Sequence, residues 1–408
     1  MLTSLPKEKL KILLLENIHP TAIQLLKQNG YSDIETHSGS LSEKDLAEKL
    51  AKTHILGIRS KSQVSEHVLK KAERLIAIGA FCIGTNQIDL QAAQRQGIAV
   101  FNSPFSNTRS VAELVIGLAI MLMRRVYEKS EGAHRGLWLK ESERCYEVRG
   151  KTLGIVGYGH IGSQVSVLAE SLGMHVVFYD IQSKLSLGNA HASRSLDDLL
   201  KRSDIITLHV PGTPETKNLI NAQRLKKMKP GAVLINLSRG DVMDTWAVKD
   251  AIERKHLGGL AVDVFPEEPK SNKDLFASPL QQLPNVILTP HIGGSTIEAQ
   301  QAIGVDVAEK LIAFTEGGST GGCLTVPDIS LPVVQNAHRI LHIHRNVPGV
   351  LSEINGLLSG MKVNILGQYL KTNAEIGYVV LDIDKKSSSR VMSELNRVKN
   401  TIRTRSLY

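Results

Sequence analysis

The chain has 408 residues, of which 42% are hydrophobic and 22% are charged. These fractions are ordinary for a globular protein and exclude a disordered chain, and the length predicts two or three domains. The formal charge is +9, but the basic residues are scattered among acids, without runs or interleaved aromatic side chains. We therefore expect a solvated surface and a site for an anionic substrate, and no nucleic-acid partner.

Cysteine spacing and hydropathy bound the cellular setting. Cys82, Cys145 and Cys323 are far apart and show neither disulfide nor metal-ligand spacing, which predicts a reducing compartment and no metal site. The apolar run Ile12 to Leu15 is too short for the core of a signal peptide, and no segment approaches the length of a membrane span. We expect a cytoplasmic protein that makes no membrane contact.

The first hundred residues show a repeating strand and helix pattern. Short apolar strands are expected at 11–15, 55–58, 75–79 and 97–101, with a helix over 18–29 after the first strand. This alternation predicts a small doubly wound domain. A longer apolar helix, from Val111 to Arg124, then leads toward the next domain and is expected to bridge the two.

The stretch 151–180 reads as strand, glycine turn, helix, strand and a single acid, which predicts a dinucleotide-binding βαβ unit. Gly157 would allow the tight turn, Gly159 the approach of a pyrophosphate, and Gly162 the close packing of the helix on the sheet. The pyrophosphate would lie at the helix N-terminus. Asp180 lies 18 residues beyond Gly162, close to the ~20 expected for the acid that binds the ribose 2′-hydroxyl. Because a carboxylate repels a 2′-phosphate, NAD is favoured over NADP.

Four more apolar strands follow, at 205–209, 233–236, 260–263 and 286–289, and each ends in polar residues. Ligands bind outside the carboxyl ends of such parallel strands. The helix expected over 296–314 returns the chain to the first domain, which is therefore predicted to be discontinuous.

The last part of the chain has a different pattern. Glu316 to Gly322, EGGSTGG, is expected to be a flexible connection. Beyond Pro332 the order βαββαβ, typical of a ferredoxin-like module, is predicted from strands and helices at 339–344, 349–358, 363–370, 378–383, 388–398 and 401–407. At about 70 residues this module is near the lower limit for stability alone, so we expect it to pair with another copy.

Three strand ends carry residues suited to hydride transfer. The reaction requires a base for the hydroxyl proton, a cation for the substrate oxygens and a group that tunes the base. Arg239 can grip a carboxylate, His291 can take the proton, and Glu268 can favour the imidazolium and fix which ring nitrogen faces the substrate. Each residue taken alone is better explained by a structural role, but their occurrence together at successive strand ends behind a nucleotide motif favours chemistry.

Several motifs resemble the D-isomer-specific 2-hydroxyacid dehydrogenase family, in order and over nearly the whole of residues 50–300. They are GYGHIG, HVP, NLSRG, DVFPEEP and TPHIGGST. FCIGTNQID and FSNTRSVAEL, together with the C-terminal module, are similar to the phosphoglycerate dehydrogenase branch of bacterial serine synthesis. The resemblance implies an α/β fold of two doubly wound parallel-sheet domains plus a ferredoxin-like ACT domain. These would be a discontinuous substrate domain (1–105 and 296–335), a Rossmann NAD domain (106–295) and the ACT domain (336–408).

The resemblance also implies roles for single residues. Arg239, Glu268 and His291 would be catalytic. Positions expected to contact NAD are Gly157, Gly159, His160, Ile161, Gly162, Asp180, His209, Asp263, Gly293 and Gly294. Positions expected to bind substrate are the backbone amides at Ile83 and Gly84 for the carboxylate, and Arg59, Ser60, Asn107 and Arg109 around the phosphate. Positions expected to hold L-serine between two ACT domains are His344, Asn346 and Asn364.

The implied function is oxidation of D-3-phosphoglycerate by a homotetramer, in a cleft between the two α/β domains, with feedback inhibition by L-serine. Two alternatives remain open: another D-2-hydroxyacid dehydrogenase acting on glycerate, 2-hydroxyglutarate or lactate, and an NAD-sensing corepressor-like protein without turnover. The ACT-like module favours a metabolic enzyme over the corepressor. Asp241 departs from the family pattern, and an acid so near Arg239 would weaken its attraction for an anion unless it points away.

Overall fold

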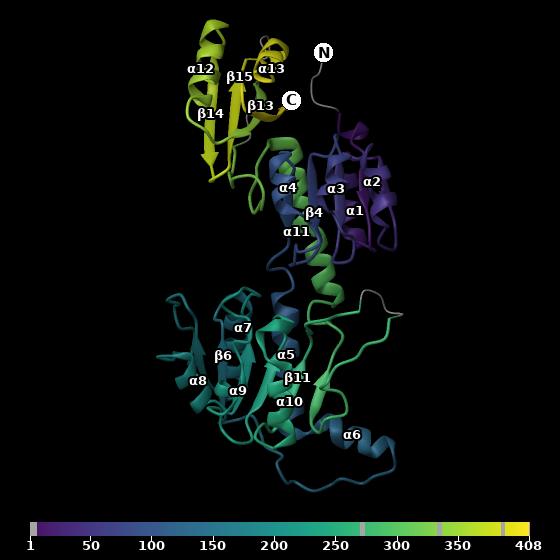
Figure 1. The fold of residues 1–408 in the computed structure, drawn as a ribbon, viewed down its shortest axis with the longest axis vertical. Coiled ribbons are helices and arrows are strands. Elements are labelled where there is room, and N and C mark those ends of the chain that lie inside the picture. The colour runs from purple at the N-terminus through teal and green to yellow at the C-terminus, as the bar shows by residue number, and fades with distance from the viewer. Residues whose placement is uncertain (1–5, 270–273, 333–336, 385–387, 408) are drawn as a thin grey trace. The chain divides into compact units, whose positions relative to one another are not determined.

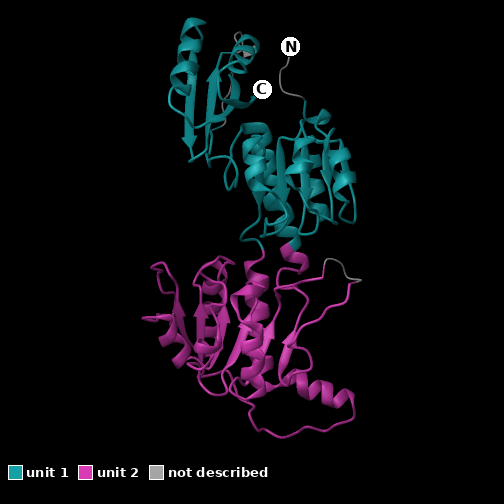
Figure 2. Ribbon diagram, viewed as in Figure 1, with its two compact units in different colours: residues 1–106, 300–408 teal, residues 107–299 magenta. Residues whose placement is uncertain are grey.

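The computed structural model describes residues 6–269, 274–332, 337–384 and 388–407. The chain divides into two compact units, one formed by residues 1–106 and 300–408 and the other by residues 107–299 (Figure 2). The first unit is discontinuous because the chain leaves it and returns. The predicted limits of the three individual domains stay a prediction.

The N-terminal part of unit 1 is a five-stranded parallel sheet in the order β2-β1-β3-β4-β5 (Figure 1). Its strands are β1 (Ile12–Leu14), β2 (Ile34–Thr36), β3 (Ile55–Ile58), β4 (Ala77–Ala80) and β5 (Ala99–Asn102). Its helices are α1 (Pro20–Gln28), α2 (Glu43–Leu50), α3 (Glu66–Lys70), α4 (Leu90–Arg95) and the returning α11 (Ile297–Gly317). Successive strand residues face opposite sides, so Leu14 belongs to one core and Leu13 to another. The predicted doubly wound arrangement is confirmed, although the short β2 has no clear apolar pattern and was missed.

Unit 2 contains a seven-stranded parallel sheet in the order β12-β11-β10-β9-β6-β7-β8. Its strands are β6 (Thr152–Val156), β7 (His175–Tyr179), β8 (His191–Ala192), β9 (Ile205–Leu208), β10 (Val233–Asn236), β11 (Gly259–Val262) and β12 (Val286–Leu288). Its helices are α5 (Thr108–Arg124), α6 (Val126–His134), α7 (His160–Ser171), α8 (Leu196–Arg202), α9 (Ala222–Leu225) and α10 (Thr245–Glu253). The strand order reverses beside β6, which is where ligands bind in sheets of this type.

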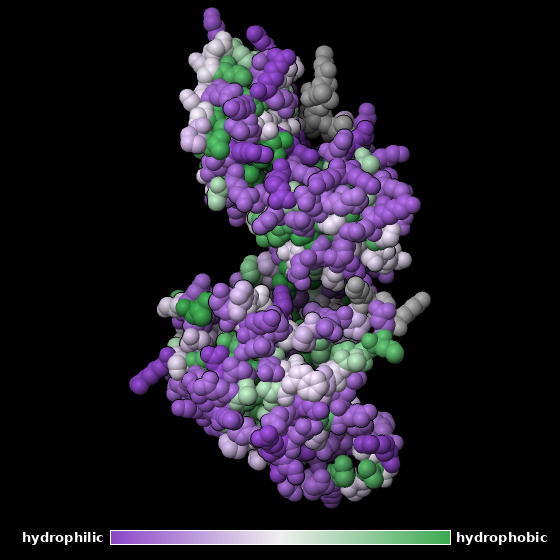
Figure 3. Space-filling view, viewed as in Figure 1, coloured by the Kyte–Doolittle hydropathy of each residue, from purple (hydrophilic) through white to green (hydrophobic). Residues whose placement is uncertain are grey.

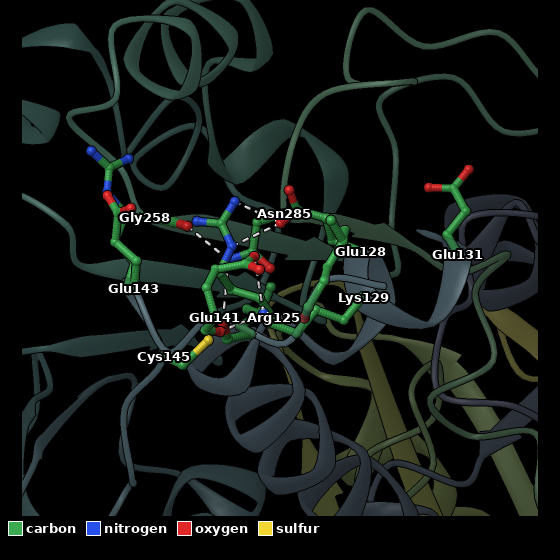
Figure 4. A network of polar contacts seen from close by, with 12 residues as sticks. Arg125, Glu128, Lys129, Glu131, Glu141, Glu143, Cys145, Gly258 and Asn285 are labelled. Atoms are coloured by element: carbon green, nitrogen blue, oxygen red, sulfur yellow. Dashed lines mark hydrogen bonds and ion pairs between the residues drawn. The ribbon is translucent and has the colours of Figure 1, made fainter. Parts of the chain in front are cut away.

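A polar network fixes the point where α5 turns into α6 (Figure 4). Arg125 ends α5 in the left-handed conformation, with φ 52°, and pairs with Glu128 on α6 at 2.6 Å. Lys129 donates to the carbonyl of Glu141 at 2.8 Å, which ties the following loop back to α6. Asn285 donates to the carbonyl of Gly258 at 2.7 Å and so joins the loops that precede β11 and β12.

The C-terminal module is a four-stranded antiparallel sheet in the order β14-β15-β13-β16, and the predicted βαββαβ order is confirmed. Its elements are β13 (His338–Arg345), α12 (Val350–Gly360), β14 (Ile365–Thr372), β15 (Ile376–Ile383), α13 (Ser388–Leu395) and β16 (Thr401–Leu407). One face of the sheet packs on α12 and α13. The other face contributes Leu341, Ile343 and Tyr378 to the same core as α11 and β1, so this module and the first sheet share buried surface.

The expectation that Glu316 to Gly322 is a flexible connection is wrong. Helix α11 continues through Gly317, and the Thr320 hydroxyl is buried, donating to the carbonyl of Pro327 at 2.6 Å. The Tyr378 hydroxyl donates to the carbonyl of Gly318 at 2.6 Å. The glycines allow a tight turn, and the hydrogen bond from Thr320 fixes it. The glycine-rich composition of this segment therefore serves a packed turn and not a flexible linker.

The surface shown in Figure 3 is largely hydrophilic, with scattered hydrophobic residues. This agrees with the interspersed charges of the sequence. Within the described parts of the chain, no helix combines the length and hydropathy needed to cross a bilayer.

A buried ion pair anchors the C-terminal sheet. Arg339 on β13 and Asp382 on β15 form two hydrogen bonds, of 2.7 and 2.9 Å, and their side chains are only 8% and 1% exposed. The hydrogen bonds to Asp382 hold the pKa of Arg339 above its usual value. The same guanidinium donates to the carbonyls of Gly317 and Pro332, so one side chain joins the sheet to the segment that precedes it.

Replacing Asp382 by Ala leaves this guanidinium buried without its charge partner, and we expect a loss of about 3–5 kcal/mol in the free energy of unfolding. The measurement is the urea midpoint followed by circular dichroism. Glu394→Ala, which removes the partner of the exposed Arg397, is the control and is expected to cost no more than about 1 kcal/mol. Equal losses in the two variants would contradict the role assigned to burial.

Candidate active site

The loop after β12 places His291 in a strained conformation. Its φ is 54°, in the left-handed region that costs a non-glycine residue free energy. The buried carboxylate of Asp263, which follows β11, holds this loop by accepting the N–H groups of Ile292 and Gly293, each at 2.8 Å, and the Thr289 hydroxyl at 2.6 Å. Asp263 therefore supplies the hydrogen bonds that keep the strained loop in place.

His291 and Glu268 form the pair that the sequence analysis inferred. The Nδ1 atom of His291 lies 2.9 Å from Oε2 of Glu268. Because an ionised carboxylate can only accept, Nδ1 carries the proton and Nε2 is left free for another partner. Glu268 also accepts the N–H of Phe265 at 3.0 Å, which fixes the carboxylate from the other side.

This pairing shifts both groups toward their charged forms. The hydrogen bond from Glu268 raises the pKa of His291, against the opposing effect of its burial. Partial burial alone would raise the pKa of Glu268, but the hydrogen bonds from His291 and from the N–H of Phe265 outweigh it and lower the pKa. An imidazole with a raised pKa can hold a proton and can release it, as an acid and base must.

Arg239 lies in a loop after β10 that is organised by Asn236. The buried Asn236 amide donates to the carbonyl of Arg239 at 2.9 Å, and its Oδ1 accepts the hydroxyl and the N–H of Ser238. A Cβ at Gly240 would overlap the backbone of Phe265, so glycine lets the Arg239 loop approach the loop that carries Glu268. Sequence analysis missed this role of Asn236, although an amide at the end of a buried strand is a usable signal.

Asp241 does not neutralise Arg239. The ion pairs formed by the described residues include none between these two side chains, and the nearest bond of Arg239 is to the carbonyl of Ser238 at 2.7 Å. The positive charge of Arg239 acts instead on His291 and Glu268, lowering the pKa of each as a minor contribution. The departure from the family pattern therefore does not tie Arg239 into an ion pair, although Asp241 lies near: a Cβ at Gly212 would meet the Cγ atom of Arg239 at 3.2 Å and the Oδ1 atom of Asp241 at 3.4 Å.

The glycine turn and the acid after β7 fit a dinucleotide. Gly157 has φ 91°, and a Cβ there would overlap the carbonyl of His209. Helix α7 begins directly after Gly159, so the N–H groups and the positive dipole end of its first turn lie next to the glycine turn. Asp180 accepts the N–H of Tyr158 at 2.8 Å, which sets the carboxylate beside the turn where a ribose is expected. These residues fit NAD.

His209 follows β9 and has a structural partner. Its Nε2 lies 2.9 Å from the Thr207 hydroxyl, and removal from water lowers its pKa to about 3, so the ring is neutral. Its carbonyl borders the glycine turn, as noted above. His209 therefore contacts the cofactor cradle through its backbone, while direct contact with NAD stays a prediction.

Residues 116–293 match the family described as D-isomer specific 2-hydroxyacid dehydrogenase, NAD binding domain, and residues 340–403 match the AHAS small subunit-like ACT domain. Over 407 residues the chain is 52% identical to the D-3-phosphoglycerate dehydrogenase of Escherichia coli strain K12, with 99% of each chain covered. The chain belongs to the D-isomer specific 2-hydroxyacid dehydrogenase family.

Other relatives agree. The D-3-phosphoglycerate dehydrogenase of Dictyostelium discoideum is 49% identical over 406 residues, covering 100% of this chain and 99% of that one. A solved D-lactate dehydrogenase from Aquifex aeolicus, complexed with NAD and lactic acid, is 29% identical with a TM-score of 0.68, covering 78% of this chain and all of that one. The predicted fold, the predicted NAD cofactor and the prediction of an NAD-dependent dehydrogenase are confirmed.

The substrate residues predicted at the N-terminal end lie in unit 1. Arg59 and Ser60 follow β3, and Ile83 and Gly84 follow β4, which is the neighbouring parallel strand. The two segments therefore emerge at the same edge of the sheet. Arg59 forms no ion pair with any described residue, which leaves its charge for a ligand.

Asn107 and Arg109 lie instead in unit 2, at the start of α5. A Cβ at Gly294 would overlap the amide of Asn107, so Asn107 packs against the loop of His291. Arg109 is exposed and pairs with Glu113 one turn along its own helix, at 2.5 Å. The residues predicted to bind the phosphate therefore lie in both units, Arg59 and Ser60 in unit 1 and Asn107 and Arg109 in unit 2. Their joint role stays a prediction.

The residues predicted to bind L-serine, His344, Asn346 and Asn364, do not all lie together within one copy of the dehydrogenase. His344 is paired with Gly377 at one end of β15, whereas Ile365, next to Asn364, is paired with Ile383 at the other end. The His344 ring is buried, which lowers its pKa, and its Nδ1 has no hydrogen-bond partner among the described residues. Asn346 donates to the carbonyl of Asn373 at 2.7 Å.

Replacing Glu268 by Gln removes the carboxylate that raises the pKa of His291. When a 2-oxo acid is reduced, the imidazolium must donate a proton, so activity falls as pH rises above the pKa of His291. We expect this fall to begin at lower pH in Glu268→Gln. The measurement is kcat/KM for NADH-dependent reduction between about pH 5 and pH 9.

Glu267→Gln, at the neighbouring exposed position, is the control and should leave the pH profile unchanged. His291→Asn should lower kcat by about 10²- to 10⁴-fold at every pH. A profile that does not move in Glu268→Gln would refute the coupling between the two side chains.

Proposed function

We propose that the chain catalyses the NAD-dependent oxidation of D-3-phosphoglycerate to 3-phosphohydroxypyruvate, the first step of L-serine synthesis. The observation that carries the proposal is the hydrogen-bonded pair of His291 and Glu268 at 2.9 Å, in a loop that Asp263 holds against strain. The full-length similarity to D-3-phosphoglycerate dehydrogenases favours this substrate over glycerate, 2-hydroxyglutarate or lactate.

The proposed mechanism assigns one task to each residue. NAD, when bound, supplies the acceptor for the hydride that leaves the hydroxyl-bearing carbon. Nε2 of His291 takes the hydroxyl proton, while Glu268 keeps the other ring nitrogen protonated and stabilises the imidazolium that forms. Arg239 binds the substrate carboxylate and the oxygen that becomes a carbonyl. In reduction, His291 returns the proton to that oxygen.

We propose that residues of unit 1 bind both ends of the substrate. The backbone N–H groups of Ile83 and Gly84 would bind the carboxylate, and Arg59 with Ser60 would bind the phosphate. Arg59 suits this task because a guanidinium without a carboxylate partner can form two parallel hydrogen bonds to phosphate. Asn107 and Arg109 would complete the phosphate contacts.

The ACT domain is proposed to bind L-serine at an interface between two copies. His344 on β13 is paired with one end of β15, and Asn364 precedes the residue of β14 that is paired with the other end, which argues against a site within one copy and in favour of one shared by two. Serine restrains the reaction only if it binds one arrangement of the chain better than another. We further propose a cytoplasmic homotetramer, with the ACT domains forming one of its interfaces.

Substrate choice is tested with NADH and two 2-oxo acids, 3-phosphohydroxypyruvate and hydroxypyruvate. We expect a strong preference for the phosphorylated acid, and we expect Arg59→Ala to lower kcat/KM for that acid by about 10- to 100-fold, the effect of one charge-assisted contact. Arg74→Ala is the control, since it removes a cation from another part of unit 1. Turnover of both acids without preference for the phosphorylated one would indicate a dehydrogenase that acts on a different substrate. Absence of turnover with either acid would favour an NAD-sensing protein.

Serine feedback is tested by repeating the assay with L-serine. We expect inhibition, and we expect Asn364→Ala to raise the serine concentration for half inhibition by about tenfold or more without changing the uninhibited rate. Asn396→Ala, another exposed asparagine of the ACT domain, should leave inhibition unchanged. Inhibition that is equal in both variants would refute the assignment of Asn364.

A further inference from the structure

Three loops of unit 1 leave neighbouring strands at one edge of the five-stranded sheet. β1, β3 and β4 are adjacent and parallel, so the segments that follow them, 15–17, 59–62 and 81–84, emerge side by side. None of these segments belongs to a helix or a strand. Backbone bonds tie the starts of two of them to β3, from Leu15 to the carbonyl of Gly57 and from Phe81 to the carbonyl of Ile58, and side-chain hydrogen bonds hold the residues beyond.

The side chain of Gln87 joins two of these segments. Its Nε2 donates to the carbonyl of Arg59 at 2.6 Å and to the carbonyl of Gly84 at 3.2 Å. A primary amide has two N–H groups, so it can bond both carbonyls at once, and the Cys82 Sγ atom at 3.4 Å is a third, weaker acceptor. Gln87 is only 8% exposed. Its main-chain carbonyl accepts the N–H of Val64 at 2.8 Å, which fixes the backbone that carries the side-chain amide.

Holding a carbonyl also aims the N–H of the same peptide unit. The unit is planar and trans, so its C=O and N–H point in opposite directions. The bond from Gln87 to Arg59 thus sets the direction of the Ser60 N–H, and a 2.7 Å bond from Asn102 to the carbonyl of Ile83 does the same for the N–H of Gly84. Among the residues that the structure describes, none accepts a hydrogen bond from these two N–H groups. Both are available to an anion.

The opposite side of the Arg59 segment is held by a buried carboxylate. Glu16 is 7% exposed and accepts the N–H groups of Lys61 and Ser62 at 2.9 and 2.8 Å. Its φ of 63° shows that the chain adopts a costly conformation to place this side chain. Since Glu16 fixes the far end of the segment, Gln87 decides how its near end lies relative to Gly84.

We propose that Gln87 is a positioning residue that sets the distance and orientation of the Arg59–Ser60 segment relative to the Ile83–Gly84 segment, and so favours substrates with an anionic group at each end. The inference rests on the proposed function, which assigns phosphate to the first segment and carboxylate to the second. A substrate without phosphate uses the second segment alone. Its turnover is therefore less sensitive to the spacing than that of the phosphorylated substrate.

The test uses Gln87→Met, which keeps the length of the side chain without a donor, and Gln87→Glu, which keeps its shape. The control is Gln91→Met, at an exposed position on α4. For the full chain and each variant, kcat and KM are measured with NADH and either 3-phosphohydroxypyruvate or hydroxypyruvate. NADH binding by fluorescence and the thermal unfolding temperature check that each variant is folded.

We expect the ratio of kcat/KM between the phosphorylated and unphosphorylated acids to fall about tenfold in both Gln87 variants, because the buried hydrogen bonds to the carbonyls of Arg59 and Gly84 are lost. The fall should arise from a higher KM for the phosphorylated acid, while kcat and the affinity for NADH stay within about twofold of the values of the unsubstituted chain. Gln91→Met should keep the original ratio.

Two other results would overturn the inference in distinguishable ways. If the unsubstituted chain prefers the phosphorylated acid and both Gln87 variants keep that preference, or lose activity on both acids equally, Gln87 has a structural role only. If the unsubstituted chain shows no preference for the phosphorylated acid, the proposed function fails and the inference about Gln87 fails with it.

Discussion

The buried carboxylate of Asp263 is the interaction on which the chemistry of unit 2 depends. It accepts three hydrogen bonds from the loop that carries His291. His291 has a left-handed backbone conformation that is unfavourable for any residue other than glycine. A loop under such strain relaxes unless fixed groups hold it. In the held conformation the Nδ1 atom of the ring lies 2.9 Å from the carboxylate of Glu268. The acid and base role proposed for His291 therefore depends on a residue to which the proposal assigns no proton transfer.

The same device recurs in both units. Asn236 folds the Arg239 loop by bonding a carbonyl and a hydroxyl, while Glu16 binds two N–H groups of the segment after Arg59. In each case a buried polar side chain at or just after a strand satisfies backbone groups of a loop that has no regular structure. Buried polar groups must be paired, so this arrangement also removes the cost of burying them. Gln87 extends the principle from one loop to two.

The C-terminal module is joined to the rest of unit 1 by packing and by specific bonds. Leu341, Ile343 and Tyr378 enter the core beneath the first sheet, and the buried pair of Arg339 and Asp382 holds two of its strands together. The connecting segment is a packed turn fixed by the hydrogen bond from Thr320 to Pro327. The proposed feedback requires that serine binds one arrangement of the chain better than another, and these packed contacts are the route by which the module and the first sheet meet.

Sequence alone determined the fold class, the glycine turn with Asp180, the three residues proposed as catalytic and the order of the C-terminal elements. These features are local: apolar periodicity and residue spacing report on strands, helices and turns directly. Tertiary structure decided the rest. The pairing of His291 with Glu268, the anchoring by Asp263 and the bridge made by Gln87 join residues that lie far apart or on different loops, and no local pattern encodes which side chain reaches which backbone group. The packing of the glycine-rich connection was misjudged for the same reason, because composition predicts freedom whereas the buried hydroxyl of Thr320 removes it.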